Sequence, residues 1–379
     1  MKNMGKIYLL IPLFLAVFGF SFFLAFGQGN FFKTDKSGNK GGSAIAREND
    51  LKDKSADNSK NYKNIMDNKP VKILFAGDLL LDRYNREIIE RYGASHFTQK
   101  ISSLFENQDL KVANLEGPVS DNRSVSVNTE NGNPGHMKFT FDRKSASDFL
   151  ESSGINAVNL GNNHILNFGE SGAGETVDFL TQAGIGYFGS PLDPRNSYIE
   201  KEINGIKIAL VNYNKFYKED LENTLNKVRE AKSKNEFVIV YAHWGSEYKL
   251  IQSQKQADSA HLLIDSGADL IIGSHPHVVQ PVEIYKGKAI FYSLGNFVFD
   301  QYFSEDVKNE LLVAVSVSRE RFDFTLFPLY TGRDGSLSLS EGEIRRELLE
   351  RIAGDSQAPD PVKAGIREGK FSLKIPAGS

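Results

Sequence analysis

The sequence contains no cysteine among its 379 residues. This absence excludes disulfides and thiolate metal ligands, so a bound metal would have to be held by His, Asp, Glu or Asn side chains. An excess of positive charge is also missing, because the net charge is -3, and the composition gives no indication of nucleic-acid binding. Hydrophobic residues make up 40% of the chain, which excludes a largely disordered protein.

The first 27 residues differ from everything that follows. Residues 7–26 form an uncharged run of apolar and small side chains, preceded by Lys2 and Lys6. A run of about 20 such residues can cross a bilayer as a helix, and the lysines favour a cytoplasmic start with the remaining chain outside. We therefore predict a single-pass membrane anchor over residues 1–27 and a domain on the extracellular side. A cleaved signal peptide is the alternative, and it also implies export.

Three further regions follow this segment. Residues 28–69 are rich in Lys, Asp, Asn, Ser and Gly, which predicts a solvated linker. The folded domain is expected over residues 70–331. After it, residues 332–379 should form one amphipathic helix, at 340–352, and a tail interrupted by Pro and Gly.

The main domain alternates strand-like and helix-like segments. Strands are predicted near residues 71–75, 111–115, 157–160, 206–212, 237–242, 270–272 and 289–293, and helices near 146–152, 174–183 and 254–265. This alternation predicts an α/β fold built largely around parallel strands. Two more runs, near 311–317 and 322–328, read as antiparallel strands.

Polar groups follow five of the predicted strands where each one ends. Four of the seven histidines are among them. Because the carboxyl ends of parallel strands share one edge of a sheet, these groups should meet on one rim. A single Asp or His there would be an ordinary cap, but five groups together would each need a buried partner. The groups are Asp78, Glu116, Asn163 with His164, His243, and His275 with His277.

A shared metal site satisfies all of these groups at once. Imidazole together with carboxylate favours Mn, Zn or Fe over Ca or Mg. Two carboxylates, one amide and three histidines are too many ligands for one tetrahedral ion. They would suit two divalent transition-metal ions bridged by one carboxylate, a pair that can activate water and neutralise a phosphoryl group.

Six motifs in this order resemble the CapA family of poly-gamma-glutamate capsule biosynthesis proteins, over about residues 71–300. That family is in turn similar to calcineurin-like metallophosphatases, whose four-layer fold holds two β-sheets between helices. The motifs are FAGDLLLDR at 75–83, NLEGP at 114–118, NNH at 162–164, HWGSEY at 243–248, GSHPHVVQPVE at 273–283 and YSLGNFVFD at 292–300.

The resemblance implies a role for each candidate ligand. Asp78 and His277 look like ligands of a first metal, and Glu116 stands where those enzymes keep the bridging carboxylate. The second metal would be held by Asn163, His243 and His275. His164 looks like the neighbouring catalytic histidine, the proton donor to a leaving oxygen.

Two positions depart from the expected pattern. The phosphatases keep a His two residues after the first Asp, where this chain has Leu80. The first metal would then be one ligand short, unless Asp82 or water supplies it. The CapA pattern usually has an Asp three residues after Asn-Asn-His, where this chain has Asn167.

Other polar residues near these motifs have weaker indications of function. Arg83 could clamp an anionic substrate or pair with Asp82. Asn296 could touch substrate, and Glu247 and Glu283 could orient ligand histidines or simply be solvated.

Three functions remain open from the sequence. The first is an assembly factor for a capsule or exopolymer, acting on an anionic polymer alongside capsule ligase or transporter proteins. The second is a metal-dependent phosphoesterase that acts on a phosphate ester of the cell envelope. The third is a non-catalytic envelope protein that keeps the fold as a binding platform. No nucleic-acid partner is expected.

Overall fold

The computed structural model describes residues 69–130, 133–192, 198–216 and 221–375. The predicted anchor and nearly all of the predicted linker lie outside these residues. Within the described ranges, no helix is long and apolar enough to cross a membrane.

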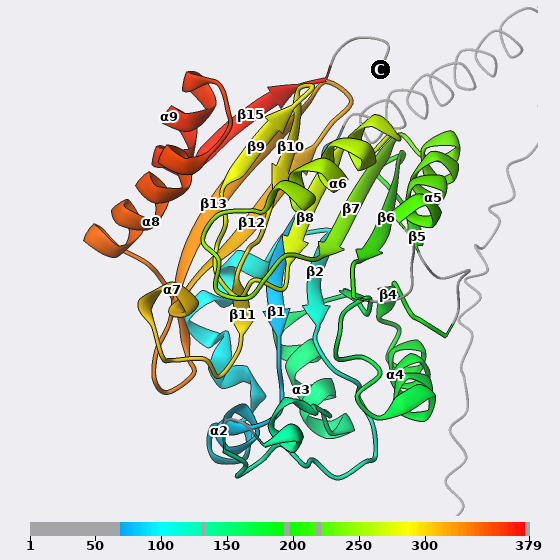
Figure 1. Ribbon diagram of the computed structural model, residues 1–379, viewed down its shortest axis with the longest axis vertical. Coiled ribbons are helices and arrows are strands. Elements are labelled where there is room, and N and C mark those ends of the chain that lie inside the picture. The colour runs from blue at the N-terminus through cyan, green and yellow to red at the C-terminus, as the bar shows by residue number, and fades with distance from the viewer. Residues whose placement is uncertain (1–68, 131–132, 193–197, 217–220, 376–379) are drawn as a thin grey trace, which may run out of the picture. The chain divides into compact units, whose positions relative to one another are not determined.

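Two β-sheets stand at the centre of the domain (Figure 1). In the first sheet, β1 to β4 and β11 run parallel, and the C-terminal strands β12 to β15 add an antiparallel half. Its nine strands are β14 (Leu337–Leu339), β13 (Arg321–Thr331), β12 (Asn309–Val317), β1 (Val71–Leu79), β2 (Leu110–Leu115), β3 (Ala157–Asn159) and β4 (Gly186–Phe188), with β11 (Asn296–Val298) beside β1 and β15 (Lys370–Lys374) beside β13.

The second sheet has six strands, of which the four central ones are parallel. In spatial order they are β5 (Tyr198–Ile203), β6 (Ile206–Asn214), β7 (Phe237–His243), β8 (Leu270–Ser274), β10 (Lys288–Phe291) and β9 (Val282–Tyr285). The predicted α/β class with parallel strands is therefore confirmed, and the parallel strands are shared between two sheets.

Helices cover the outer face of each sheet, so the domain has helix, sheet, sheet and helix layers. The alternation along β1 follows from the two-residue period of a strand: Ile73 and Phe75 pack between the sheets, whereas Leu74 packs against the first helical layer. That layer consists of α2 (Tyr84–Tyr92), α3 (Arg143–Ser153), α4 (Gly169–Gln182) and the 3-10 turns η1 (Ala94–Phe97) and η2 (Gln99–Phe105). The layer on the second sheet consists of α5 (Leu221–Lys234) and α6 (Gln254–Asp265).

The C-terminal region is more integrated than the sequence indicated. The predicted helix is present as α8 (Gly342–Asp355), but the predicted tail is wrong, because the chain continues as α9 (Asp360–Glu368) and β15. Leu349 and Ile366 are fully buried in the core between the sheets. The Pro and Gly residues that suggested a tail are helix boundaries: Pro359 precedes α9 and Gly369 ends it in a left-handed conformation.

The ends of five parallel strands meet at one rim of the two sheets. Asp78 of β1 lies opposite Asn114 of β2, and His243 of β7 lies opposite Ser274 of β8. Glycine permits this close assembly, since a Cβ atom at Gly77 would lie 2.0 Å from the carbonyl oxygen of Gly295. The predicted rim is confirmed, although two sheets build it together.

Candidate metal centre

Two fully buried carboxylates form the floor of the rim. Asp78 lies near the end of β1 and Glu116 lies one residue beyond β2. The Asp78 carboxylate accepts hydrogen bonds from the Asn114 amide at 2.8 Å and from the backbone N–H of His275 at 2.9 Å. Among the described residues, the hydrogen bond that Glu116 receives is long, 3.4 Å from the Asn114 amide to one carboxylate oxygen. The other oxygen, Oε1, has no hydrogen-bond partner among the described residues.

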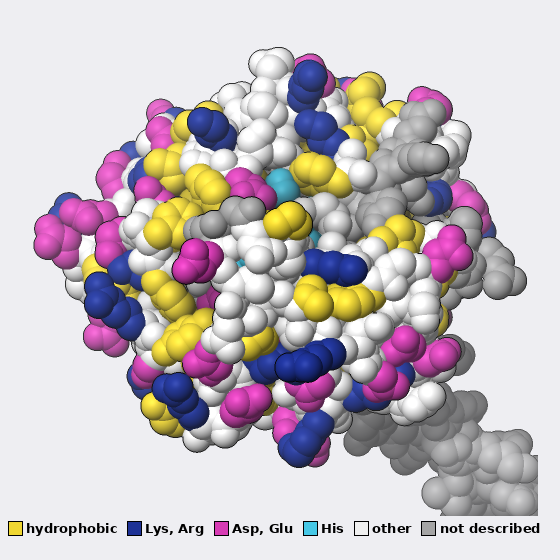
Figure 2. All heavy atoms as spheres, turned by 60° about the horizontal axis from the view of Figure 1, so that its bottom comes forward, with side chains coloured by type: hydrophobic (Ala, Val, Ile, Leu, Met, Phe, Trp, Pro, Cys, Tyr) yellow, Lys and Arg dark blue, Asp and Glu magenta, His cyan; other side chains and the backbone are white. Residues whose placement is uncertain are grey.

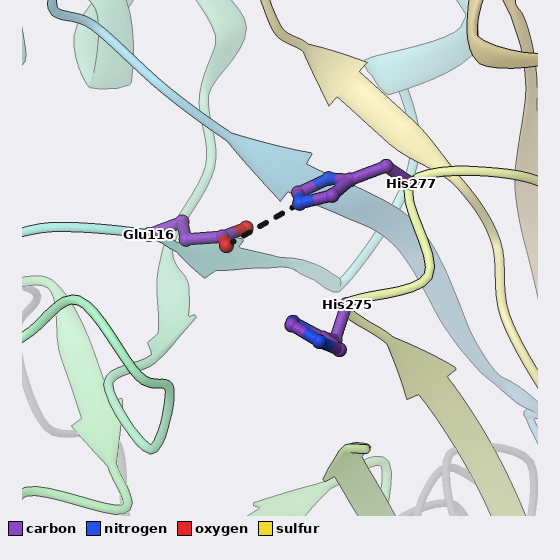
Figure 3. Close-up of side chains that lie close together, drawn as sticks. All are labelled: Glu116, His275 and His277. Atoms are coloured by element: carbon purple, nitrogen blue, oxygen red, sulfur yellow. Dashed lines mark ion pairs between the residues drawn. The ribbon is translucent and has the colours of Figure 1, made fainter. Parts of the chain in front are cut away.

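Histidine nitrogens surround this unpartnered oxygen. The Nε2 atoms of His277, His164 and His243 lie 3.8, 3.9 and 4.0 Å from Glu116 Oε1. Figure 3 shows Glu116 on the segment that follows β2, facing His275 and His277 on the segment that follows β8. One donor atom from each of these three residues lies within 4.8 Å of the others, as expected of a possible metal-binding cluster.

The electrostatics of these residues fit a cation. Burial raises the pKa of Asp78 to about 7, and burial together with the Asp78 charge raises the pKa of Glu116 well above its ordinary value. Burial also lowers the pKa of His275 to about 4, and the pKa of His243 and of His277 well below the ordinary value. Buried carboxylates that lack a cation, beside neutral imidazoles that offer lone pairs, are the donor set that a metal ion satisfies.

Neighbouring side chains hold the imidazole rings in place. His277 Nδ1 lies 2.9 Å from Asn296 Oδ1, and His243 Nδ1 lies 3.0 Å from Ser274 Oγ. On the other edge of its ring, His243 Nε2 lies 2.8 Å from Asn163 Oδ1, which brings two predicted ligands into contact. His275 Nδ1 is buried without a partner in the described part of the chain. Such supporting contacts fix the orientation of metal ligands.

His164 lies beside the donor set, and a turn fixes its ring. Its Nδ1 is 3.1 Å from Asn167 Oδ1, across a turn in which the Asn167 backbone N–H donates to the His164 carbonyl at 2.9 Å. Asn167 Oδ1 also accepts the backbone N–H of Phe139 at 2.8 Å, which identifies it as an acceptor, so Nδ1 carries the proton and Nε2 faces Glu116. The Phe139 ring packs 4.3 Å from the imidazole, centroid to centroid, and burial lowers the pKa of His164 to about 4.

Leu80 occupies the position at which the phosphatases have a metal-binding histidine, and it is fully buried. Asp82 does not replace that ligand. The Asp82 carboxylate instead accepts hydrogen bonds from Arg86, from Ser126 Oγ at 2.8 Å and from the Thr140 backbone at 2.9 Å. The possibility that Asp82 supplies a metal ligand was therefore wrong.

Arg83 is near the site, but it pairs with a different acid from the one predicted. Its guanidinium binds Asp300 through two nitrogens, whereas Asp82 pairs with Arg86. Its guanidinium carbon lies 5.0 and 5.3 Å from the ring centroids of Phe139 and Phe299, whose planes are 82° apart. The alternative of an Arg83–Asp82 pair was wrong, and use of Arg83 as an anion clamp stays a prediction.

The remaining weak candidates have identifiable contacts. Asn296 is buried and supports His277, while its amide group donates to Gln301 and to the Val307 carbonyl. Glu283 orients a histidine outside the site: it contacts His261 Nε2 at 2.7 Å and accepts from the Tyr292 hydroxyl. Its proposed support of a ligand histidine was wrong. Glu247 is partly exposed, and its charge helps to raise the pKa of Glu116.

Sequence reasoning missed the residues that connect the ligands. The Asn114 amide donates hydrogen bonds to the carboxylates of Asp78 and Glu116, and the Ser274 hydroxyl contacts the His243 ring. Both residues stood inside the recognised motifs without an assigned role, and their position at strand ends was the available signal. Figure 2 shows the face that carries this rim, with histidine atoms visible near its centre beside acidic and hydrophobic side chains and with basic ones nearby.

Comparison with known proteins identifies relatives of the sequence. The sequence model of a family described as "Bacterial capsule synthesis protein PGA_cap" matches residues 72–301. The PGA biosynthesis protein CapA of Bacillus subtilis is 29% identical over 72% of this chain and 76% of its own length. The capsule biosynthesis protein CapA of Bacillus anthracis is 30% identical, and the match spans 62% of this chain and 61% of that protein.

Solved structures give only a weak likeness. Vps29 of Chaetomium thermophilum aligns with a TM-score of 0.31 and 10% identity, over 72% of this chain and 94% of that one. Vacuolar protein sorting 29 of Cryptosporidium parvum aligns with a TM-score of 0.27 and 14% identity, over 72% and 96% of the two chains. Scores this low support no conclusion about the fold or the site, which rest on the contacts given above.

Proposed function

The chain belongs to the PGA_cap family of bacterial capsule synthesis proteins, and from this premise we propose that it is an exported factor for assembly of a capsule or exopolymer of the poly-gamma-glutamate type. We further propose that it works through a centre for two divalent transition-metal ions, Mn, Zn or Fe. The observation that carries the proposal is the unpartnered, buried Glu116 Oε1 among three histidine nitrogens. A buried carboxylate oxygen normally has its own donors, whereas this one faces histidine nitrogens instead.

The donor set divides into two groups around Glu116. Asp78 and His277 are in contact, with 3.4 Å between Oδ2 and Nδ1, and form one group. His243 and Asn163 are in contact and form the second group with His275, whose ring centroid is 4.8 Å from that of His243. Glu116 would be shared by both. Bound ions there would neutralise an anionic substrate and lower the pKa of water.

His164 would carry the proton transfers at this centre. With Nδ1 donating to Asn167, its Nε2 faces Glu116 and would accept a proton or, once protonated, donate one. The lowered pKa keeps the metal-free imidazole neutral, so a donor role needs an anion beside it to restore the charge. An anionic polymer or a phosphate ester would provide that anion.

Residues 1–27 would anchor the domain to the cell membrane, with the domain on the extracellular side and in reach of capsule ligase or transporter proteins. The motivation is the uncharged run at 7–26 after two lysines. Fractionation of cells should place the full-length chain in the membrane pellet and leave its domain open to external protease. Release as a shortened soluble protein would instead indicate signal cleavage.

A second candidate function is hydrolysis of a phosphate ester in the cell envelope. The observation that favours it is His164, an acid–base group whose Nε2 lies 3.9 Å from the central carboxylate. A non-catalytic platform is favoured by Leu80, which leaves the first group of ligands one short of the phosphatase pattern.

Two assays with one variant test these functions. A capsule-producing host that lacks its own family member should regain surface polymer with the wild-type chain and not with Glu116→Gln. Purified full-length chain with added Mn should hydrolyse a chromogenic phosphate ester only if the second function applies. Equal restoration of polymer by both chains would contradict any role for the metal centre in assembly.

A further inference from the structure

Strained backbone is concentrated at the rim. Eight non-glycine residues of the described chain have a positive φ, and three of them are asparagines, which tolerate this conformation. Four of the other five belong to the site: Arg83 at 54°, Tyr248 at 62°, His275 at 91° and His277 at 57°. Residues held in such conformations cluster at ligand clamps and active sites. The two histidines are candidate ligands and Arg83 is fixed by its ion pair, but the donor set gives Tyr248 no role.

The strain at Tyr248 presents an aromatic ring at the mouth of the site. Its backbone N–H donates to the carbonyl of Pro276, between the two candidate ligands His275 and His277, at 2.8 Å. Its ring lies 6.2 Å from that of His277, with 31° between the planes, and its hydroxyl accepts from Gln301 at 3.1 Å. The side chain nevertheless remains 42% exposed. The fold therefore holds this ring in place without covering it.

Exposed aromatic rings lie on both sides of the donor set. Phe303 contacts the Tyr248 ring edge-on at 5.1 Å and is 65% exposed. On the other side, Phe216 is 43% exposed, and its ring centroid is 4.3 Å from His275 and 5.8 Å from His243. Exposed aromatic surface is unfavourable in water, and its gathering at a polar centre marks a place that a ligand covers.

We propose that Tyr248 and Phe216 contact the organic group of the substrate, and that the substrate is an anion attached to a ring or a comparably flat apolar face. The anionic end would meet the donor set while the flat face rests on the aromatic side chains, which bind such faces by stacking. This inference rests on the second candidate function, hydrolysis of a phosphate ester, because it assumes that the donor set takes an anion and because a poly-gamma-glutamate chain carries no ring. A small anion without an organic group would occupy the donor set and leave the rings of Tyr248 and Phe216 without a contact.

Binding of two non-hydrolysable anions to the full-length, Mn-loaded chain tests the inference. Phenylphosphonate and methylphosphonate share the anionic group and differ by the ring, and titration calorimetry gives a Kd for each. We expect phenylphosphonate to bind about tenfold more tightly, as one added aromatic contact supplies. Tyr248→Ala should reduce this ratio to about one, whereas Tyr248→Phe, which keeps the ring, should preserve it. Tyr92→Ala is the matched control, because Tyr92 is 59% exposed and stacks on His96 outside the donor set.

The outcomes separate this inference from the proposed function. An unchanged ratio in both Tyr248→Ala and Phe216→Ala would overturn the inference, even if the chain restores polymer or hydrolyses esters. A ratio lost in Tyr248→Ala but kept in Tyr92→Ala would support it, even if no turnover is found. Cyclohexylphosphonate, whose ring is not flat, should bind more weakly than phenylphosphonate, and equally tight binding would contradict stacking of a flat face on Tyr248 and Phe216. Failure of every anion to bind would overturn the inference together with the metal centre.

Discussion

Two buried carboxylates at opposite ends of the parallel strands have opposite surroundings. Asp269 directly precedes β8 and is 8% exposed, and it accepts hydrogen bonds from Lys232, Lys288 and the Val238 backbone. Glu116 follows β2 and is fully buried, yet one of its oxygens has no partner within the described chain. The protein therefore supplies cationic partners for Asp269, whereas Glu116 would obtain its cation from a bound metal ion. Burial alone therefore does not distinguish a structural acid from a ligand, but an unpartnered oxygen that faces histidine nitrogens does.

His164→Ala should have the largest effect on any hydrolysis, a loss of about 10²- to 10⁴-fold, because it removes the proton-transfer group beside the donor set. Metal content should stay at the parent level. The measurement is kcat with Mn alongside metal analysis of the same sample, and His261→Ala is the control for loss of an imidazole elsewhere. A variant that folds but loses its metal would show that His164 is a ligand.

The two acids should respond in opposite ways to neutralisation. In the metal-free chain, Asp269→Asn should lower the free energy of unfolding by about 3 kcal/mol, because Lys232 and Lys288 lose their buried partner. Glu116→Gln should leave it unchanged or raise it by about 1 kcal/mol, because it removes a buried charge that lacks a cation. Urea unfolding in the presence of a chelator measures both. Equal losses in the two variants would end the distinction between these acids.

The pH dependence of the metal-free chain sharpens the same comparison. Asp78 and Glu116 have raised pKa values, so their contribution to stability is present below about pH 4. The Asp78 contribution is lost as the pH rises through about 7, and the Glu116 contribution is lost as the pH rises through its own raised pKa. His164, His243, His275 and His277 have lowered pKa values, so their contribution is present above about pH 6.5 and falls as the pH decreases below it. The contribution of His164 and His275 is lost by about pH 4.

Below about pH 6.5, the four histidines change the free energy of unfolding more than the two carboxylates do. Above that pH, only the two carboxylates change it. Stability should therefore rise from about pH 4 to 6.5 and then fall by about 1 to 2 kcal/mol over the next pH unit. Unfolding by urea across this range checks the prediction. Glu116→Gln should flatten the fall above pH 6.5, and Asp269→Asn should not. A fall of the same size in both variants would contradict the assignment.

The sequence predicted much of this architecture because most of its signals are local. Helix α6 begins and ends at the predicted residues, where Ser253 and Gln256 form a capping box. The donor set was predicted because strand ends and histidines are both visible in a linear sequence. The packing of α9 and β15 was not, because Pro and Gly mark a helix boundary and a tail in the same way. Nor could the sequence indicate the Arg83–Asp300 pair or the strained Tyr248, since both depend on contacts between distant segments.

Asn167→Asp should have the smallest effect. The Asn167 oxygen already bonds His164 and the Phe139 backbone, so an aspartate can keep both contacts and add a negative charge. That charge should raise the pKa of His164, shift the acidic limb of the pH–rate profile upward and increase the rate by a few-fold, well under the roughly tenfold that 1.4 kcal/mol represents. An unchanged profile at equal metal content would mean that residue 167 only stabilises the turn.

Metal analysis of the purified full-length chain tests the central claim most directly. The account predicts about two transition-metal ions per wild-type chain, as two bridged ions require, and loss of both in Glu116→Ala. Asp269→Asn should keep the wild-type content, because its carboxylate already has cationic partners within the protein. A wild-type chain that takes up no metal, or a Glu116→Ala chain that keeps its full complement, would contradict the account.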